Sequence, residues 1–226
     1  ASAMMNASTG TENTALGNLA MAGGVTTGNS NVALGHGAGY NISSGQDNTL
    51  VGTGTGDSIT SGNRNTAVGF AALATENAHG NNTAIGYAAL NTLDADAEGY
   101  NVAIGSNSGK LMTSGVNNSL LGYNSGTAIT TGANNVALGQ GALGANTTAS
   151  DNVAIGVSAL GANVLGASSI AIGLQSLAQQ VPSGATVMHN VGVGQKTGFA
   201  VTTGVQNTLI GGLAGDALTT GDNNII

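Results

Sequence analysis

Aliphatic and polar residues follow one another in a five-residue phrase, Asn-x-Ala-aliphatic-Gly, that recurs along the whole chain. The phrase starts thirteen times, once with Ser in place of Asn, and nine of the twelve steps between starts are 17 residues. Self-similarity at a fixed period is typical of repeat architectures, in which each unit buries its apolar side only by stacking on the next. The pattern therefore predicts a solenoid. The starts are Asn13, Asn31, Asn48, Asn65, Asn82, Asn101, Asn118, Asn135, Asn152, Ser169, Asn190, Asn207 and Asn224.

Each phrase is typical of a short β-strand. With its Asn as repeat position 0, position 1 is Thr, Val, Ser or Ile, position 2 is mostly Ala, and position 3 is aliphatic in every complete unit. Side chains alternate between the two faces of a strand. We expect positions 1 and 3 to fill the interior of the coil. The Ala and Gly of positions 2 and 4 would then be covered by a neighbouring chain, because a strand that is apolar on both faces is usually covered on both.

A coil of this length predicts a flattened turn with two sides. At about 3.3 Å per residue, a 17-residue repeat makes a circuit of roughly 56 Å, which suits two short strands joined by two turns. The second half of the repeat comes in two versions that each supply one more large aliphatic side chain to close the coil. One version has Gly at position 8 and an aliphatic residue at position 11, and these pairs are Gly39 with Ile42, Gly56 with Ile59, Gly109 with Met112, Gly126 with Ile129, Gly198 with Val201, and Gly215 with Leu218. The other version has Leu at position 8, at Leu73, Leu90, Leu143, Leu160 and Leu177.

Two positions predict backbone geometry, the Asn at position 0, which is Ser in one repeat, and the invariant Gly at position 4. The Asn at position 0 is expected to stack into a ladder of amide hydrogen bonds between coils, and Asn also suits turns. The Gly at position 4 predicts a positive φ or a close backbone approach at a corner. These structural glycines are Gly17, Gly35, Gly52, Gly69, Gly86, Gly105, Gly122, Gly139, Gly156, Gly173, Gly194 and Gly211.

Composition excludes several function classes. Only 6% of the 226 residues are charged, the net charge is −7, and Arg64, Lys110 and Lys196 are the only Lys and Arg residues. Nucleic-acid binding is not expected, because no basic patch exists to neutralise phosphates. No apolar run of about 18 residues is present, so no membrane insertion is expected from a helix. Cysteine is absent, and the Gly-x-Gly fragments lack the strand–loop–helix context of a phosphate cradle, so no cofactor is expected.

The phrases Asn82-Thr-Ala-Ile-Gly-Tyr-Ala-Ala-Leu90 and Asn152-Val-Ala-Ile-Gly-Val-Ser-Ala-Leu160 resemble the head repeats of YadA-type trimeric autotransporter adhesins and the related repeats of phage tail fibres. The resemblance covers residues 11–226, although the repeat here is longer than the usual adhesin repeat. It implies a parallel, left-handed β-roll assembled as a homotrimer and displayed at a bacterial cell surface or on a virion. We expect a lead-in at residues 1–10, a single solenoid region at 11–226, and a longer fibre protein of which this chain is a fragment, since it ends inside a phrase.

Two insertions and one aromatic column are the candidate binding features. Asp94, Asp96 and Glu98 lie in the first insertion, where their spacing suits a hard cation such as Ca²⁺, with a solvated loop as the alternative. The second insertion spans residues 179–189, and insertions in solenoids often form the binding face. It contributes Gln180 and Pro182 as candidate contacts. The aromatic residues Phe70, Tyr87 and Tyr123 share position 5, where they would hold sugar rings or simply pack against each other.

The leading hypothesis is a trimeric fibrous adhesin or tail-fibre segment that attaches to a host-surface glycan or protein, extracellularly or on a virion. A purely structural spacer is the main alternative. An ice-binding solenoid is suggested by Thr pairs such as Thr26-Thr27, but the Leu units interrupt that array. An enzyme such as a polysaccharide depolymerase is not expected, because His36, His79 and His189 lie in separate units and no carboxylate pair accompanies them.

Overall fold

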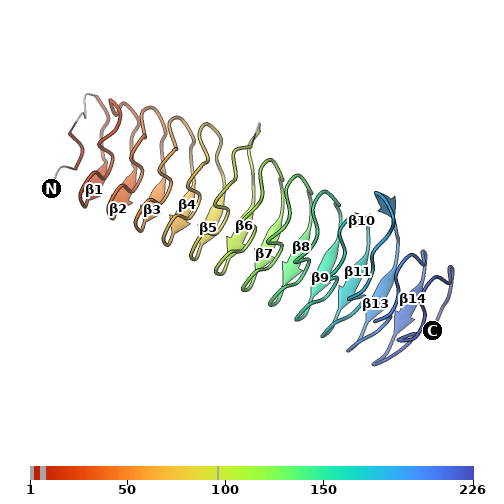
Figure 1. The fold of residues 1–226 in the computed structure, drawn as a ribbon. Coiled ribbons are helices and arrows are strands. Elements are labelled where there is room, and N and C mark those ends of the chain that lie inside the picture. The colour runs from red at the N-terminus through yellow and green to blue at the C-terminus, as the bar shows by residue number, and fades with distance from the viewer. Residues whose placement is uncertain (1–2, 6–8, 96) are drawn as a thin grey trace. The chain divides into compact units, whose positions relative to one another are not determined.

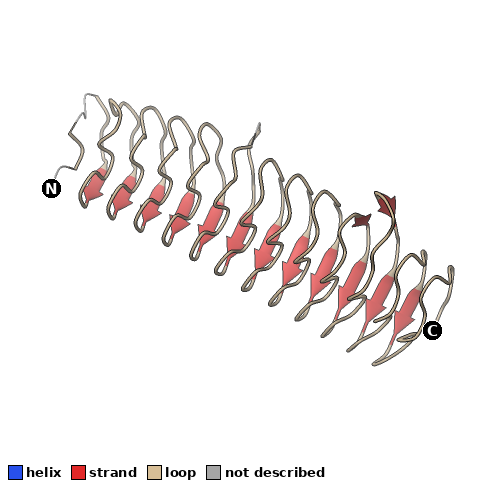
Figure 2. Ribbon diagram, viewed as in Figure 1, coloured by secondary structure: helices blue, strands red, loops and turns tan. Residues whose placement is uncertain are grey.

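The computed structural model describes residues 3–5, 9–95 and 97–226, and these form an all-β parallel solenoid of about twelve turns without any helix (Figures 1 and 2). The chain divides into two compact units, Ala1–Val116 and Asn117–Ile226. Within each unit the strands lie side by side and point in the same direction (Figure 2). The predicted parallel solenoid with coils of about 17 residues is therefore confirmed.

Each strand of the main sheet consists of positions 1 to 3 of one repeat. In the first unit these strands are β1 (Thr14–Leu16), β2 (Val32–Leu34), β3 (Thr49–Val51), β4 (Thr66–Val68), β5 (Thr83–Ile85) and β6 (Val102–Ile104). In the second unit they are β7 (Ser119–Leu121), β8 (Val136–Leu138), β9 (Val153–Ile155), β11 (Ile170–Ile172), β13 (Val191–Val193) and β14 (Thr208–Ile210). Pairing places like position opposite like position, so that Thr49 faces Thr66 on the next strand.

The return half of the coil differs from the sequence prediction. A second short strand is predicted there, but in the repeats that the structure describes this half consists of turns, apart from the two-residue strands at Gly166–Ala167 and Thr186–Val187. The reason is that residues at position 8 have a left-handed backbone, with φ of 58° at Gly56 and 51° at Leu73, which breaks an extended strand. These turns still bond to the neighbouring coil, since the Leu73 N–H donates to the carbonyl oxygen of Ala89 at 3.0 Å.

The predicted assignment of inside and outside is wrong. Ala67 and Ala84 at position 2 are completely buried, whereas Val32 and Leu34 at positions 1 and 3 are 37% and 42% exposed. In most repeats the coil is too narrow for a bulky side chain on the strand to face a bulky side chain on the return half. Position 8 lies opposite position 2, and a Cβ added at Gly56 would come within 2.8 Å of Leu50 Cδ2. A small residue is therefore required on one of the two sides.

The predicted exchange of aliphatic residues in the return half is confirmed. Ile42 and Ile59 at position 11, and Leu73 and Leu90 at position 8, are all completely buried. Where Leu fills position 8, position 11 is polar in four of the five repeats, and the exception is Leu93, which is also completely buried. In three of these repeats the polar residue caps the following turn. The capping oxygens are Glu76 Oε1, Asn146 Oδ1 and Asn163 Oδ1, which accept hydrogen bonds from the backbone N–H three residues later at 3.0, 3.1 and 2.9 Å.

The predicted Asn ladder and Gly corner are also confirmed. The side-chain amide of Asn48 donates to Asn31 Oδ1 at 3.0 Å and to the Gly62 carbonyl oxygen at 2.8 Å, while Asn48 Oδ1 accepts the Asn65 N–H at 3.0 Å. At the corner, Gly69 has a φ of 135°, and an added Cβ would lie 2.4 Å from the carbonyl oxygen of Gly86. Both features fix the level and the spacing of successive coils within a unit.

One rung of the ladder is built differently. Ser169 replaces Asn in the second unit, and the buried side chain of Gln180 supplies the missing amide. Gln180 Nε2 donates to Ser169 Oγ at 3.1 Å, and Gln180 Oε1 accepts a hydrogen bond from Asn190 Nδ2 at 2.9 Å. A residue from the second insertion therefore completes the interior hydrogen-bond ladder.

Candidate functional site

The outer side of the strands forms an exposed apolar surface on each unit, which we call the aliphatic face. It consists of position 3, which is aliphatic in all twelve of these strands, and of position 1, which is Val or Ile in six of them and Thr or Ser in the other six. Its position-3 side chains are partly exposed, and Leu121 and Leu138 are 45% and 40% exposed. Parallel strands lie about 4.8 Å apart, so the position-3 side chains form a continuous row within each unit. Large exposed apolar patches mark interaction surfaces on soluble proteins. The row comprises Leu16, Leu34, Val51, Val68, Ile85 and Ile104 in the first unit, and Leu121, Leu138, Ile155, Ile172, Val193 and Ile210 in the second.

A second feature is an open groove in the first unit, which we call the glycine groove. It has a volume of about 390 Å³ and follows the turns after strands β2, β3 and β4. Asp57 lies at its side, and burial raises the pKa of the Asp57 carboxyl above its ordinary value. The groove is lined by Leu19, His36, Gly37, Tyr40, Thr53, Gly54, Asp57, Phe70 and Ala71.

The aromatic column is partly formed. The Phe70 and Tyr87 rings are stacked, with centroids 5.5 Å apart and ring planes within 9° of parallel, as the shared repeat position predicted. Both side chains are more than half exposed. Tyr123 occupies the same repeat position in the second unit and is also exposed. Phe70 is the member of the set that lines the glycine groove.

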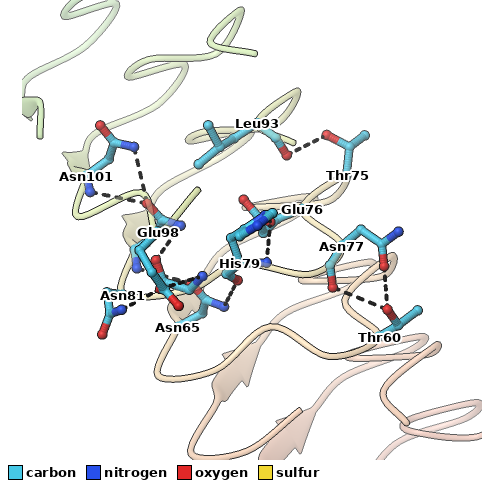
Figure 3. Close-up of polar contacts among 12 residues, drawn as sticks. Thr60, Asn65, Thr75, Glu76, Asn77, His79, Asn81, Leu93, Glu98 and Asn101 are labelled. Carbon is cyan, nitrogen blue, oxygen red and sulfur yellow. Dashed lines mark hydrogen bonds and ion pairs between the residues drawn. The ribbon is translucent and has the colours of Figure 1, made fainter. Parts of the chain in front are cut away.

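The first insertion is held against the preceding coil. Glu98 Oε2 accepts hydrogen bonds from the Gly80 N–H at 3.1 Å and from Asn81 Nδ2 at 2.5 Å (Figure 3). Asp94 is exposed, and Asp96 lies outside the described residues. Among the side chains that the structure describes, no three of His, Cys, Asp or Glu come together as a metal site. The Ca²⁺ hypothesis thus stays a prediction without support from the described part of this loop.

A buried carboxylate lies beside that insertion. Glu76 is completely buried, and its Oε1 is 3.9 Å from His79 Nδ1 (Figure 3). Burial raises the pKa of Glu76, and the nearby Asp94 carboxylate raises it further. Three effects oppose this shift, namely the hydrogen bonds from the His79 and Ala95 N–H groups and the charge of His79. Glu76 Oε2 and His79 Nδ1 make no hydrogen bond of normal length. The net result is a pKa of Glu76 above its ordinary value.

The second insertion does not present its candidate residues to a ligand. Gln180 is buried in the ladder described above, and Pro182 is buried as well. The insertion instead adds a two-residue strand, β12 (Thr186–Val187), which pairs with β10 (Gly166–Ala167). Val187 on β12 is 54% exposed and Val181 is 43% exposed, so the insertion presents these side chains rather than Gln180 or Pro182.

Sequence reasoning missed part of the glycine groove. The sequence predicts an isolated surface position for His36 and does not single out Tyr40 or Asp57, yet the structure places all three along one groove. The signal in the sequence is a pair of glycines, Gly37 and Gly54, at position 6 of successive repeats.

Comparisons with known proteins give no relative from which a function could be transferred. No protein-family model, curated protein or solved structure matches the chain. Within the described ranges, no helix is long and apolar enough to cross a membrane. Functional inference therefore depends on the aliphatic face and the glycine groove.

Proposed function

We propose that the chain is a segment of a homotrimeric surface fibre, of the adhesin or tail-fibre type, which attaches to a host or cell surface. The observation that carries the proposal is the aliphatic face. All twelve position-3 residues of the strands are aliphatic, and no charged residue occupies position 1 or 3 in any complete repeat. A sheet face of this kind is stabilised when a partner removes it from water, by about 25 cal/mol for each Å² of apolar area.

Copies of the same chain are the partner that suits this face. The row of position-3 residues repeats at the strand spacing, so a second copy in the same register meets the same spacing. Closed symmetric assemblies are the usual outcome for such self-complementary surfaces, and three copies around an axis agree with the resemblance of the repeats to trimeric fibre heads. A trimer presents every surface contact three times, and this multivalency strengthens weak attachment to a cell surface.

The test is the subunit number of the chain, measured by native mass spectrometry, combined with a cell-binding assay. The Leu138→Glu variant places a charge on the aliphatic face and is expected to give monomers. The matched control is Thr131→Glu, which puts the same charge at an exposed turn residue of the second unit and should leave the trimer intact. A wild-type chain that is a stable monomer, or a Leu138→Glu variant that remains trimeric, would contradict the proposed assembly. A trimer that binds no cells would leave only the spacer function.

A further inference from the structure

The glycine groove exists because two successive coils lack a side chain at position 6. Gly37 and Gly54 occupy this position with φ of 64° and 61°, and a Cβ added at Gly54 would meet nothing within 4 Å. The coils on either side carry Leu19 and Ala71 at position 6, and these two residues line the groove at its ends. The groove is therefore a gap two coils long in a column of side chains, and it has the volume of a small-molecule site.

The residues around this gap combine an aromatic platform with hydrogen-bonding groups. Phe70 is held by its stacking on Tyr87, with 5.5 Å between the ring centroids. The Asp57 carboxylate is half-buried and makes no hydrogen bond or ion pair with the residues that the structure describes. His36 and Tyr40 add further polar atoms at the rim. A ligand that fits must offer an apolar ring face to Phe70 and donate hydrogen bonds to Asp57.

The charges indicate that this ligand is not an anion. Asp57 is the only Asp, Glu, Lys or Arg residue among the groove-lining residues. An anionic sugar would bring its charge next to the half-buried carboxylate, and no Lys or Arg lines the groove to compensate it, which is unfavourable. A neutral pyranose satisfies both requirements, because its hydroxyl groups donate to the carboxylate and its C–H face packs on an aromatic ring.

We propose that the glycine groove is a binding site for a neutral pyranose unit of a surface glycan, with Phe70 as the stacking platform and Asp57 as the hydroxyl acceptor. The assignment rests on the attachment function proposed above, since it names the ligand class of one contact of that fibre. It gives the chain a defined glycan contact in the first unit, in addition to the self-association of the aliphatic face.

The test uses methyl hexopyranosides as neutral probes and the corresponding hexuronates as anionic probes, with binding measured by saturation-transfer NMR and titration. Wild-type protein is expected to bind at least one neutral probe, and to bind its hexuronate at least tenfold more weakly. The Gly54→Leu variant should reduce binding at least tenfold, because the side chain fills the groove. Leu is compatible with the backbone there, since Leu19 holds the same repeat position with a φ of 61°. Asp57→Asn should weaken binding while the circular dichroism spectrum stays unchanged.

The matched control is Gly141→Leu, which makes the same change at position 6 of the second unit, where φ is 64°. This variant should bind the neutral probe like wild type, so that a folding defect is separated from a loss of the groove. The inference is overturned if no neutral probe binds, if hexuronates bind equally well, or if Gly54→Leu binds normally. Cell attachment distinguishes the two proposals. Attachment that persists in Gly54→Leu refutes the groove alone, whereas a wild-type chain that does not attach refutes the fibre function. If Gly54→Leu abolishes attachment but no sugar inhibits the attachment of the wild type, the groove binds a protein and the proposed glycan ligand is wrong.

Discussion

The Asn ladder makes a quantitative prediction for the Asn48→Ala variant. Asn48 is completely buried, and its side chain is the hydrogen-bond partner of the Asn65 N–H and of the Gly62 carbonyl oxygen, at 3.0 and 2.8 Å. Removing the amide leaves two buried backbone groups without a partner. Each such group costs about 1–3 kcal/mol, so we expect the free energy of unfolding to fall by about 2–6 kcal/mol.

The matched control is Asn63→Ala in the same repeat. Asn63 Oδ1 also accepts a backbone hydrogen bond, from the Gln46 N–H at 2.8 Å, but at an exposed position where water can replace it. This variant should lose less than about 1 kcal/mol. Stability is measured by urea unfolding followed by circular dichroism. Because coils interact mainly with their nearest neighbours, hydrogen exchange in Asn48→Ala should increase around residues 31–80. Equal destabilisation by the two variants would refute the ladder as a major source of stability.

Two further predictions concern buried polar side chains. Burial raises the pKa of Glu76, so its stabilising contribution is complete below the ordinary value of 4.5 and is lost as the pH rises through the raised pKa of the folded state. Glu76→Gln should therefore reduce the fall in melting temperature as the pH rises above 4.5. Glu12→Gln, at an exposed site, should leave that fall unchanged. Parallel pH profiles of melting temperature for the wild type and both variants would contradict this prediction. In the second unit, Gln180→Ala should lower the free energy of unfolding by about 1–3 kcal/mol, because Ser169 Oγ loses its partner and Asn190 Nδ2 keeps only the Gly204 carbonyl oxygen. Adding Ser169→Asn to that variant should restore part of the loss by rebuilding the ladder, and a urea double-mutant cycle without any coupling would argue against this role.

Much of the fold could be predicted because the repeat fixes backbone geometry at a few positions. Gly at position 4 and Asn at position 0 each have one structural role that recurs in nearly every coil, as Gly69 and Asn48 show. Local spacing is sufficient to identify such roles. The residue that caps a turn, such as Asn146, could also be anticipated as polar, since Leu143 already fills the core of its coil.

The interior and exterior faces could not be assigned from alternation alone. A period of two separates the faces of a strand, but it does not say which face is enclosed. The deciding quantity is the volume shared by positions 2 and 8 across the coil. A signal for it does exist in the sequence, because Leu occupies position 2 only in repeats with Gly at position 8: Leu50 with Gly56, Leu120 with Gly126, and Leu209 with Gly215. The glycine groove could not be predicted for a related reason, since Tyr40 and Asp57 line the same groove as His36 only when successive turns are stacked.

The reversal of the two faces increases the need for a partner. If Ala and Gly were outside, each coil would expose only small apolar groups. With Leu, Ile and Val outside instead, Leu138 and its neighbours expose far more hydrocarbon for each strand. The aliphatic face belongs to the strands, whereas the glycine groove follows the turns after them, so self-association and glycan contact use different parts of the coil. Leu138→Glu, in the second unit, should therefore leave the affinity of each chain for a neutral pyranoside unchanged while cell attachment falls through the loss of multivalency. A parallel loss of both would mean that the groove is completed by a second copy of the chain.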